Sequence, residues 1–146
     1  MSFAISTIGV EKLRTSMRQR TNKLKNRRAV NKRAVVQVDA WVQKNFRSEG
    51  DLAHPGSGWE PLKESTKKSR RGIAPYKILQ DTGQLRSRWK HYSDNDTALI
   101  QSGVDYGGYH QQGSGKLPQR RILPTREQIL PILKVLYKQF VKLSIG

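Results

Sequence analysis

Apolar residues in the first third of the chain recur at the spacing of an amphipathic helix. No Pro or Gly interrupts residues 10–46, and one stripe at 3.6 residues per turn holds most of the large apolar side chains. The stripe consists of Val10, Leu13, Met17, Leu24, Val35, Val38, Val42 and Phe46. We therefore predict a long N-terminal helix over about residues 10–46.

This stripe has a gap in its middle, where Arg28 and Asn31 occupy positions that apolar residues should fill. Two structures fit the gap: the helix projects from the globular body there, or it breaks into two helices. Isolated breaks usually carry Gly or Pro, and residues 25–33 contain neither. The pattern therefore favours a continuous or gently bent helix.

Residues 47–123 form a loop-rich middle, in which a β-hairpin is the clearest element. Residues 86–92 alternate and contain Trp89 and Tyr92, residues 93–96 have the composition of a turn, and residues 97–103 form the returning strand.

The rest of this middle contains only short elements. We expect a polar helix over about residues 65–72 and a helical turn over residues 82–85 with Thr82 as its N-cap. A short helix or a turn follows at residues 104–113, and an extended segment at residues 117–123.

A second amphipathic helix follows, over about residues 125–144. Thr125 and Gln128 fit a capping box at its start. Its apolar stripe is made of Ile129, Leu133, Leu136, Phe140 and Leu143. Pro131 either kinks this helix or marks its true first turn.

Charge changes the picture of the first helix. Lys and Arg number 28 against 11 acids, so the formal net charge is +17, and ten of these cations lie between residues 12 and 33 with no acid among them. Ordinary solvated helix faces mix both signs, because pairs of opposite charge stabilise helices. We expect contact with nucleic acid or with an acidic protein surface, and the leading candidates are Arg14, Arg18, Lys25, Arg28 and Lys32.

The sequence contains little that indicates catalysis or metal binding. There is no Cys, which excludes disulfides and thiolate metal sites, and none of His54, His91 and His110 has a partner at the spacing of a helical metal site. Asp94 and Asp96 are expected to serve as turn residues, and no Gly-rich phosphate loop occurs. We therefore expect neither an enzyme nor a cofactor. We also expect a soluble protein, because no apolar run approaches the roughly 20 residues that span a bilayer and no secretory signal begins the chain.

Three short signatures follow one another between residues 56 and 123, each combining large apolar residues with Gly, Pro or Thr. The first is GWEPL at residues 58–62 with Thr66, the second is ILQDTGQL at residues 78–85, and the third is YHQQG at residues 109–113 followed by LPQRRIL at residues 117–123. This composition is typical of a tightly turned scaffold. Its tryptophan, together with Trp41 and Trp89, is expected to anchor a core or an interface rather than to stack on bases.

The order and spacing of these signatures resemble the phage virion morphogenesis family, which includes the tail completion proteins of P2-like phages and the G protein of Mu-like phages. The resemblance spans about residue 35 to the C-terminus, and the basic first half of the long helix lies outside it. Tyr109, Arg121 and Ile122 depart from the family's usual residues. The matching motif residues are Trp59, Pro61, Leu62, Asp81, Thr82, Gly83, Gly113, Pro118 and Arg120.

The length of 146 residues suits one domain of residues 1–146. What the resemblance implies is an α+β fold, with a long N-terminal helix and a C-terminal helix packed on a small antiparallel β-sheet. It also implies a structural virion protein that acts in tail completion or head–tail joining, as a component of a homo-oligomeric neck or connector ring. The expected partners are other virion proteins of the neck, portal side or tail, with non-specific contact to phage DNA and no membrane. Such a protein assembles in the host cytoplasm and resides at the head–tail junction or the tail end. The net charge alone suggests an alternative, a non-specific nucleic-acid-binding protein that acts as a monomer or dimer.

Strand alternation and the motif predict different orientations for Arg120. If Leu117 faces the core, alternation turns Gln119 inward and Arg120 outward, yet the motif singles out Arg120. We predict an irregular backbone after Pro118 that turns Arg120 inward, where its donors hold carbonyls of the 109–113 turn or of the Thr82 region. Arg121 is then expected to be exposed, and the alternative for Arg120 is a solvated surface arginine.

Overall fold

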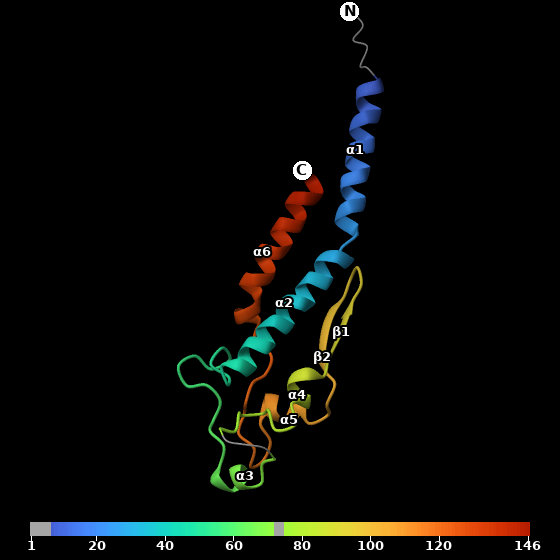
Figure 1. The fold of residues 1–146 in the computed structure, drawn as a ribbon. Helices are drawn as coiled ribbons and strands as arrows, with labels where there is room; N and C mark the ends of the chain where they lie inside the picture. The colour runs from blue at the N-terminus through green and yellow to red at the C-terminus, as the bar shows by residue number, and fades with distance from the viewer. Residues whose placement is uncertain (1–6, 72–74) are drawn as a thin grey trace, which may run out of the picture.

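The central element of the fold is a helix that the hairpin and the last helix flank on opposite sides (Figure 1). The structure is a computed structural model, and it describes residues 7–71 and 75–146, with side chains from Val10 onward. In chain order its elements are α1 (Thr7–Lys25), α2 (Arg28–Arg47), α3 (Glu64–Lys68), α4 (Gln84–Ser87), β1 (Trp89–Ser93), β2 (Ala98–Ser102), α5 (Gly107–Gln112) and α6 (Arg126–Ile145). The fold is α+β, as predicted, with α2 between the β1–β2 hairpin and α6.

The hairpin is antiparallel and confirms the sequence prediction, with Trp89 opposite Ser102 and Tyr92 opposite Leu99. In its turn, the carboxylate of Asp94 accepts hydrogen bonds from the backbone N–H groups two and three residues ahead. The hydroxyl of Tyr92 donates to the same carboxylate at 2.7 Å. These donors lower the pKa of Asp94, with the Tyr92 hydroxyl as the largest cause, so the carboxylate that organises the turn remains ionised at neutral pH.

The prediction of one continuous N-terminal helix is wrong, because the chain breaks at Asn26 and Arg27 between α1 and α2. The physical reason is the hairpin turn that docks there. Arg27 donates to the carbonyl of Asn95 at 2.9 Å and to Asp96 at 2.6 Å, while the backbone N–H of Arg28 donates to Oδ1 of Asn95 at 3.1 Å. A continuous helix would have directed that N–H to a carbonyl four residues earlier, so an acceptor from a distant segment replaces the helical one.

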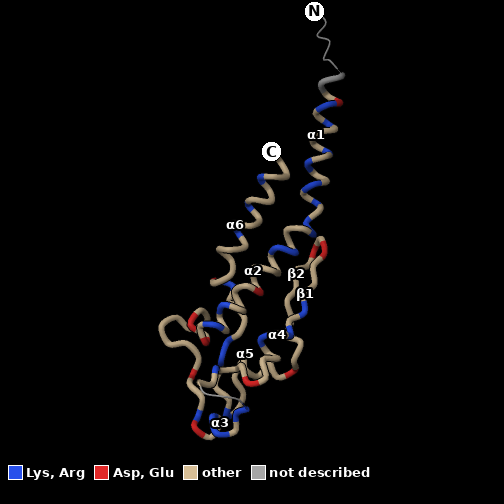
Figure 2. The backbone as a smooth tube through the Cα atoms, viewed as in Figure 1, with Lys and Arg blue, Asp and Glu red and all other residues tan. Residues whose placement is uncertain are grey.

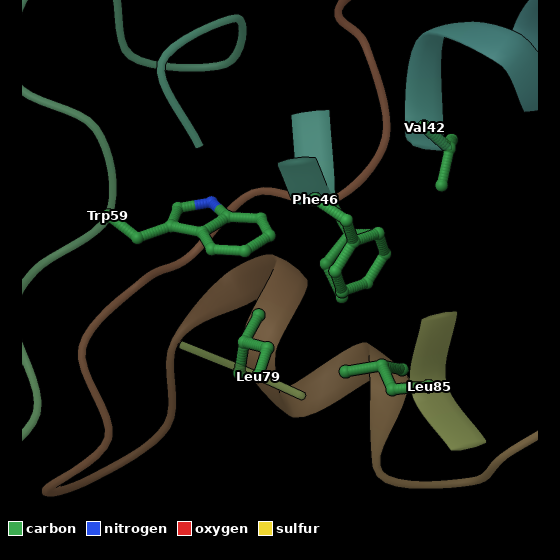
Figure 3. Close-up of a cluster of buried hydrophobic side chains, with 6 residues drawn as sticks. Val42, Phe46, Trp59, Leu79 and Leu85 are labelled. Atoms are coloured by element: carbon green, nitrogen blue, oxygen red, sulfur yellow. The ribbon is translucent and has the colours of Figure 1, made fainter. Parts of the chain in front are cut away.

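The core lies where the second half of α2 meets the loops and short helices. Phe46 and Trp59 pack edge to face with ring centroids 5.3 Å apart (Figure 3). The buried cluster consists of Val42, Phe46, Trp59, Leu79, Leu85 and Ile122, and Trp41 and Trp89 pack against it. All three tryptophans therefore serve as core anchors, as predicted.

Two buried asparagines on α2 join it to distant segments. Asn45 is fully buried, donates to the carbonyl of Arg121 at 3.0 Å and accepts from the N–H of Ala53 at 3.1 Å. Asn31, which fills the gap in the apolar stripe, donates to the carbonyl of Asp94 at 2.8 Å and accepts from the hydroxyl of Tyr137. Asn31 thus links α2 to the hairpin turn and to α6, which explains a polar residue where the pattern called for an apolar one.

The start of α6 confirms the predicted capping box. Gln128 donates its N–H to the Thr125 side chain, while the N–H of Thr125 donates to Oε1 of Gln128 at 2.9 Å. Pro131 lies inside the helix, so the alternative that the first turn begins there is wrong. The predicted stripe of α6 is half-buried as far as Phe140, whereas Leu143 is exposed and the neighbouring Ser144 is buried.

The remaining short elements differ from the sequence predictions in detail. The polar helix over 65–72 is the shorter α3, and Gly72 lies outside the described residues. The predicted N-cap Thr82 is wrong, because Gly83 at φ 72° takes that position and α4 begins one residue later. Residues 107–112 form the short helix α5, and the expected extended segment after Leu117 makes only one isolated bridge, between Ser114 and Leu117.

Candidate functional site

The motif residues come together at the end of the molecule that carries α3, α4 and α5 (Figure 1). A cleft of about 540 Å³ opens among these elements. Five of the nine motif residues line it, namely Leu62, Asp81, Thr82, Pro118 and Arg120. The signatures, which are spread over more than sixty residues of sequence, therefore build one local structure.

Arg120 turns inward and forms part of the wall of this cleft, with only 7% of its surface exposed. Its Nε and Nη2 both donate to the carbonyl of Glu60, at 3.1 and 2.9 Å, and Nη2 also lies 3.4 Å from the carbonyl of Pro61. The expected carbonyl partners, in the 109–113 turn or near Thr82, are therefore wrong for the side chain. Burial lowers the pKa of Arg120, while the nearby carboxylate of Glu60 opposes that shift.

The backbone around Arg120 is irregular, and the premise of strand alternation does not hold. Leu117, which was expected to face inward, is exposed. Gly113 adopts φ 76°, and a Cβ there would lie 3.2 Å from the backbone nitrogen of Gln119, so the two segments pass too closely for a side chain. The N–H of Arg120 then donates to the carbonyl of His110 at 2.8 Å, which fixes the segment after Pro118 against α5.

Arg121 was expected to be exposed, and this is wrong. It is half-buried and its guanidinium donates to the carbonyl of Ala53. Its own carbonyl accepts from the indole N–H of Trp59 at 2.9 Å as well as from Asn45. Because consecutive residues of an irregular segment need not alternate, both arginines turn toward the body.

The other signature residues hold the loops around the cleft in place. Gln111, inside the third signature, accepts at its Oε1 from the N–H groups of Ile122 and Leu123, at 2.7 and 3.0 Å. Asp81 of the second signature lies 3.6 Å from Arg70, which is largely buried. The N–H of Trp59 donates to the carbonyl of Glu49 at 2.8 Å. These contacts join the two parts of the third signature, hold the second signature to the segment after α3, and hold the first to the loop after α2.

Charged groups surround an apolar floor in this cleft. Leu62, Leu79 and Leu85 line it together with the cations Lys63 and Lys116. His110 is also in the lining, with a buried Nδ1 that has no hydrogen-bond partner in the described structure, and burial followed by the charge of Arg120 lowers its pKa. The acids Glu60 and Asp81 line the cleft as well, so its charges are of both signs. Among the described residues, no group of three His, Cys, Asp or Glu could hold a metal ion.

The predicted basic residues lie elsewhere. All five are exposed, and α1 and the start of α2 form the end of the molecule opposite to α3 (Figure 2). Three of them, Arg14, Arg18 and Lys25, are on α1, and the other two, Arg28 and Lys32, are in the first turns of α2. The molecule therefore has two separate candidate surfaces, the motif cleft and a basic helical end.

Sequence reasoning missed the contributions of Lys63 and Lys116 to the cleft and of Asn45 to the core. Nothing in their local pattern distinguishes them from solvated polar residues. The apolar stripe of α1 was predicted, and a helix that projects from the body was one of the two structures that fitted its gap. Leu13 and Met17 remain 62% and 59% exposed.

Comparison with known proteins identifies one family. The model of the phage virion morphogenesis family matches residues 8–131. The match therefore includes most of α1 as well as the cleft, and it starts well before the residue 35 that the motif pattern indicated. A search of the curated proteins and of the solved structures finds no match. None of the described helices combines the length and the apolar composition needed to cross a membrane.

Proposed function

The chain belongs to the phage virion morphogenesis family, and on that premise we propose that it acts in tail completion or head–tail joining as a subunit of a ring at the neck or the tail end. Family membership supports a structural role in the phage particle together with contacts to other virion proteins. The finer assignment is supported most by one observation: α1 projects past the hairpin turn with Leu13 and Met17 exposed, so one end of the molecule presents apolar surface (Figure 1).

This projecting helix is poorly suited to an isolated monomer. Its basic side chains repel one another, and its one acid, Glu11, lies 3.7 Å from Arg14. Exposed apolar residues beside unbalanced charge are typical of a surface that a partner covers. We therefore assign α1 to assembly rather than to the stability of the folded body.

The difference between the two ends of the molecule supports a ring. The motif cleft lies among α3, α4 and α5. Figure 2 shows these elements at the end of the backbone opposite to α1, along which Lys and Arg recur. Subunits that join through two different surfaces form head-to-tail interfaces, which close into rings when the rotation between subunits permits. In this proposal those surfaces lie on the folded body around the cleft, and α1 is left to a different virion protein. Motif residues such as Trp59, Gly113 and Arg120 then act by holding the loops of each subunit in shape.

A second candidate function is non-specific binding of nucleic acid by a monomer or dimer, and the concentration of cations on α1 favours it. Such a protein would bind duplex DNA of any sequence, with an affinity that falls steeply as salt rises. It would not need to be present in finished particles.

The deciding experiment removes the protein from a phage that encodes it and examines the particles by electron microscopy and mass spectrometry. Without the protein, we expect unjoined heads and tails, or tails whose ends are incomplete. After complementation, we expect the protein to be present in the particles. Complete infectious particles without the protein would overturn the proposal. A purified protein that binds duplex as a monomer and is absent from particles would favour the second candidate.

A further inference from the structure

The exposed apolar residues of α1 run between two rows of basic side chains. At 100° per residue, the stripe of Val10, Leu13 and Met17 occupies one face of the helix. Arg14, Arg18 and Lys25 lie on one side of this stripe, Arg20 and Lys23 lie on the other, and Lys12 lies further round, beside Gln19. Thr15, Gln19 and Asn22 lie on the opposite face, so α1 is an amphipathic basic helix in which cations frame the apolar face.

Nothing in the described structure covers this face over its outer turns. Val10, Leu13 and Met17 are each more than half exposed. Near the inner end, Leu24 is half-buried and α1 contacts α6. The uncovered part is therefore limited to the turns that project furthest from the body (Figure 1).

We propose that the outer half of α1 docks into an apolar groove with an acidic rim on another virion protein. This inference rests on the proposed function, because it takes the partner to be a protein of the same particle. The partner's groove has two features: an apolar floor that contacts Leu13 and Met17, and carboxylates on both sides that pair with the two basic rows. This is the helix-in-groove mode of recognition, with anchors spaced by three and four residues.

DNA fits these observations less well than an acidic protein surface. Phosphates would pair with the basic rows, but binding of that kind requires no apolar side chain and would leave the stripe in contact with water. Because the stripe lies between the rows, a partner that pairs with both must also cover it. An acidic rim around an apolar floor satisfies the two requirements together.

A second copy of this chain is also a poor occupant. α1 carries six Lys and Arg residues against one acid, so two copies of this helix repel each other, and the lining of the motif cleft also holds more cations than acids. Asp96 in the hairpin turn already pairs with Arg27, and Glu11 with Arg14. We therefore assign the complementary charge to a different protein.

Photo-crosslinking in assembled particles tests the proposal directly. The photoreactive residue p-benzoylphenylalanine replaces Leu13 in one variant and Gln19, on the opposite face, in the matched control. We expect the probe at Leu13 to crosslink to one other virion protein, within a peptide where apolar residues alternate with Asp or Glu, and the probe at Gln19 to give little product. Crosslinks from Leu13 to DNA or to another copy of this chain, or none at all, would overturn the proposal.

Paired substitutions separate the apolar stripe from the charges. Leu13→Gln with Met17→Gln keeps every charge, and we expect it to reduce incorporation into particles about tenfold while leaving affinity for a short duplex within about twofold. Arg14→Gln with Arg18→Gln should reduce both, and Thr15→Ala with Gln19→Ala should change neither. If the stripe variant enters particles normally, or if the stripe instead drives flotation with anionic phosphatidylserine vesicles, the inference is wrong.

The same samples distinguish this inference from the proposed function. Normal tail joining by the stripe variant would overturn the docking role while the ring proposal stands. Absence of the wild-type protein from purified particles, by mass spectrometry, would overturn both.

Discussion

α1 and the second half of α2 have the same apolar spacing and opposite environments. Val42 and Phe46 on α2 have no exposed surface, whereas Leu13 and Met17 on α1 are exposed over more than half of theirs. α2 lies between the hairpin and α6 and packs against both (Figure 1). In the described structure, α1 packs mainly against α6. An amphipathic pattern thus indicates a face that needs a partner, and it does not tell whether the partner belongs to the same chain.

The polar side chains of the two helices also differ in burial. On α2, Asn31 and Asn45 hold distant segments through hydrogen bonds that are largely buried. On α1, the basic side chains are exposed, and one ion pair, Glu11 with Arg14, links two of its residues. α2 is therefore built into the body while α1 is presented by it, and the break at Asn26 and Arg27 separates these two roles.

The largest expected effect is a loss of stability from a substitution in the buried half of α2. Phe46→Ala should lower the free energy of unfolding by about 3–5 kcal/mol, because it leaves a cavity beside Trp59. Leu13→Ala should change it by no more than about 0.5 kcal/mol, since the side chain is exposed. Denaturant unfolding measures both. Similar losses in the two variants would show that α1 is packed in solution.

A smaller loss is expected at Arg120. Arg120→Lys should cost about 1–3 kcal/mol, because one ammonium cannot reproduce two donors on the carbonyl of Glu60 and leaves a buried acceptor poorly satisfied. Arg121→Lys, which is less buried, should cost less. Unfolding and incorporation into particles are measured side by side. If the two variants behave alike, Arg120 has no special role in the cleft.

The contact between α2 and α6 should have a modest effect. Tyr137→Phe removes the hydroxyl that donates to Asn31 and should lower the free energy of unfolding by about 0.5–1.5 kcal/mol. Tyr109→Phe, at a residue that is 58% exposed, is the control and should be close to neutral. An equal loss at both sites would mean that the link through Asn31 does not stabilise the body.

The smallest expected effect is a dependence on pH that is confined to the body. Burial lowers the pKa of His110 and of His54, so the folded state favours their neutral forms. As pH falls below the ordinary value of about 6.5, the unfolded state takes up protons first and the free energy of unfolding decreases, until the pH passes below the folded-state values. Unfolding measured from about pH 7.5 down to about pH 5.5 should show this slope.

The double substitution His54→Gln with His110→Gln should flatten the slope, whereas Leu13→Ala should leave it unchanged. The reason is that no histidine occurs in α1. If the double variant keeps the wild-type slope, the two buried histidines are not its source.

Local chemistry explains which elements could be predicted. The hairpin forms where alternating aromatic and apolar residues flank a turn that Asp94 organises, and α6 starts where Thr125 and Gln128 cap each other. Each of these depends on residues within a few positions of one another. The family resemblance was accessible for the same reason, since its signatures are short, and the match over residues 8–131 confirms it.

Predictions failed where a distant segment decided the local structure. The break before α2 depends on Asn95 and Asp96, which are almost seventy residues away. Arg121 turns inward toward Ala53, again across more than sixty residues. Periodicity and capping rules describe neighbours along the chain and contain no information about such partners.

The sequence by itself determined the helical and strand patterns, the capping of α6, the excess of positive charge and the family. Only the tertiary structure decided that Asn31 would serve as a junction, that Arg120 would hold the carbonyl of Glu60, and that the apolar face of α1 would remain uncovered. The physical reason is that secondary structure arises mainly from local hydrogen bonding and side-chain period. Burial, in contrast, depends on which surfaces the whole chain brings together.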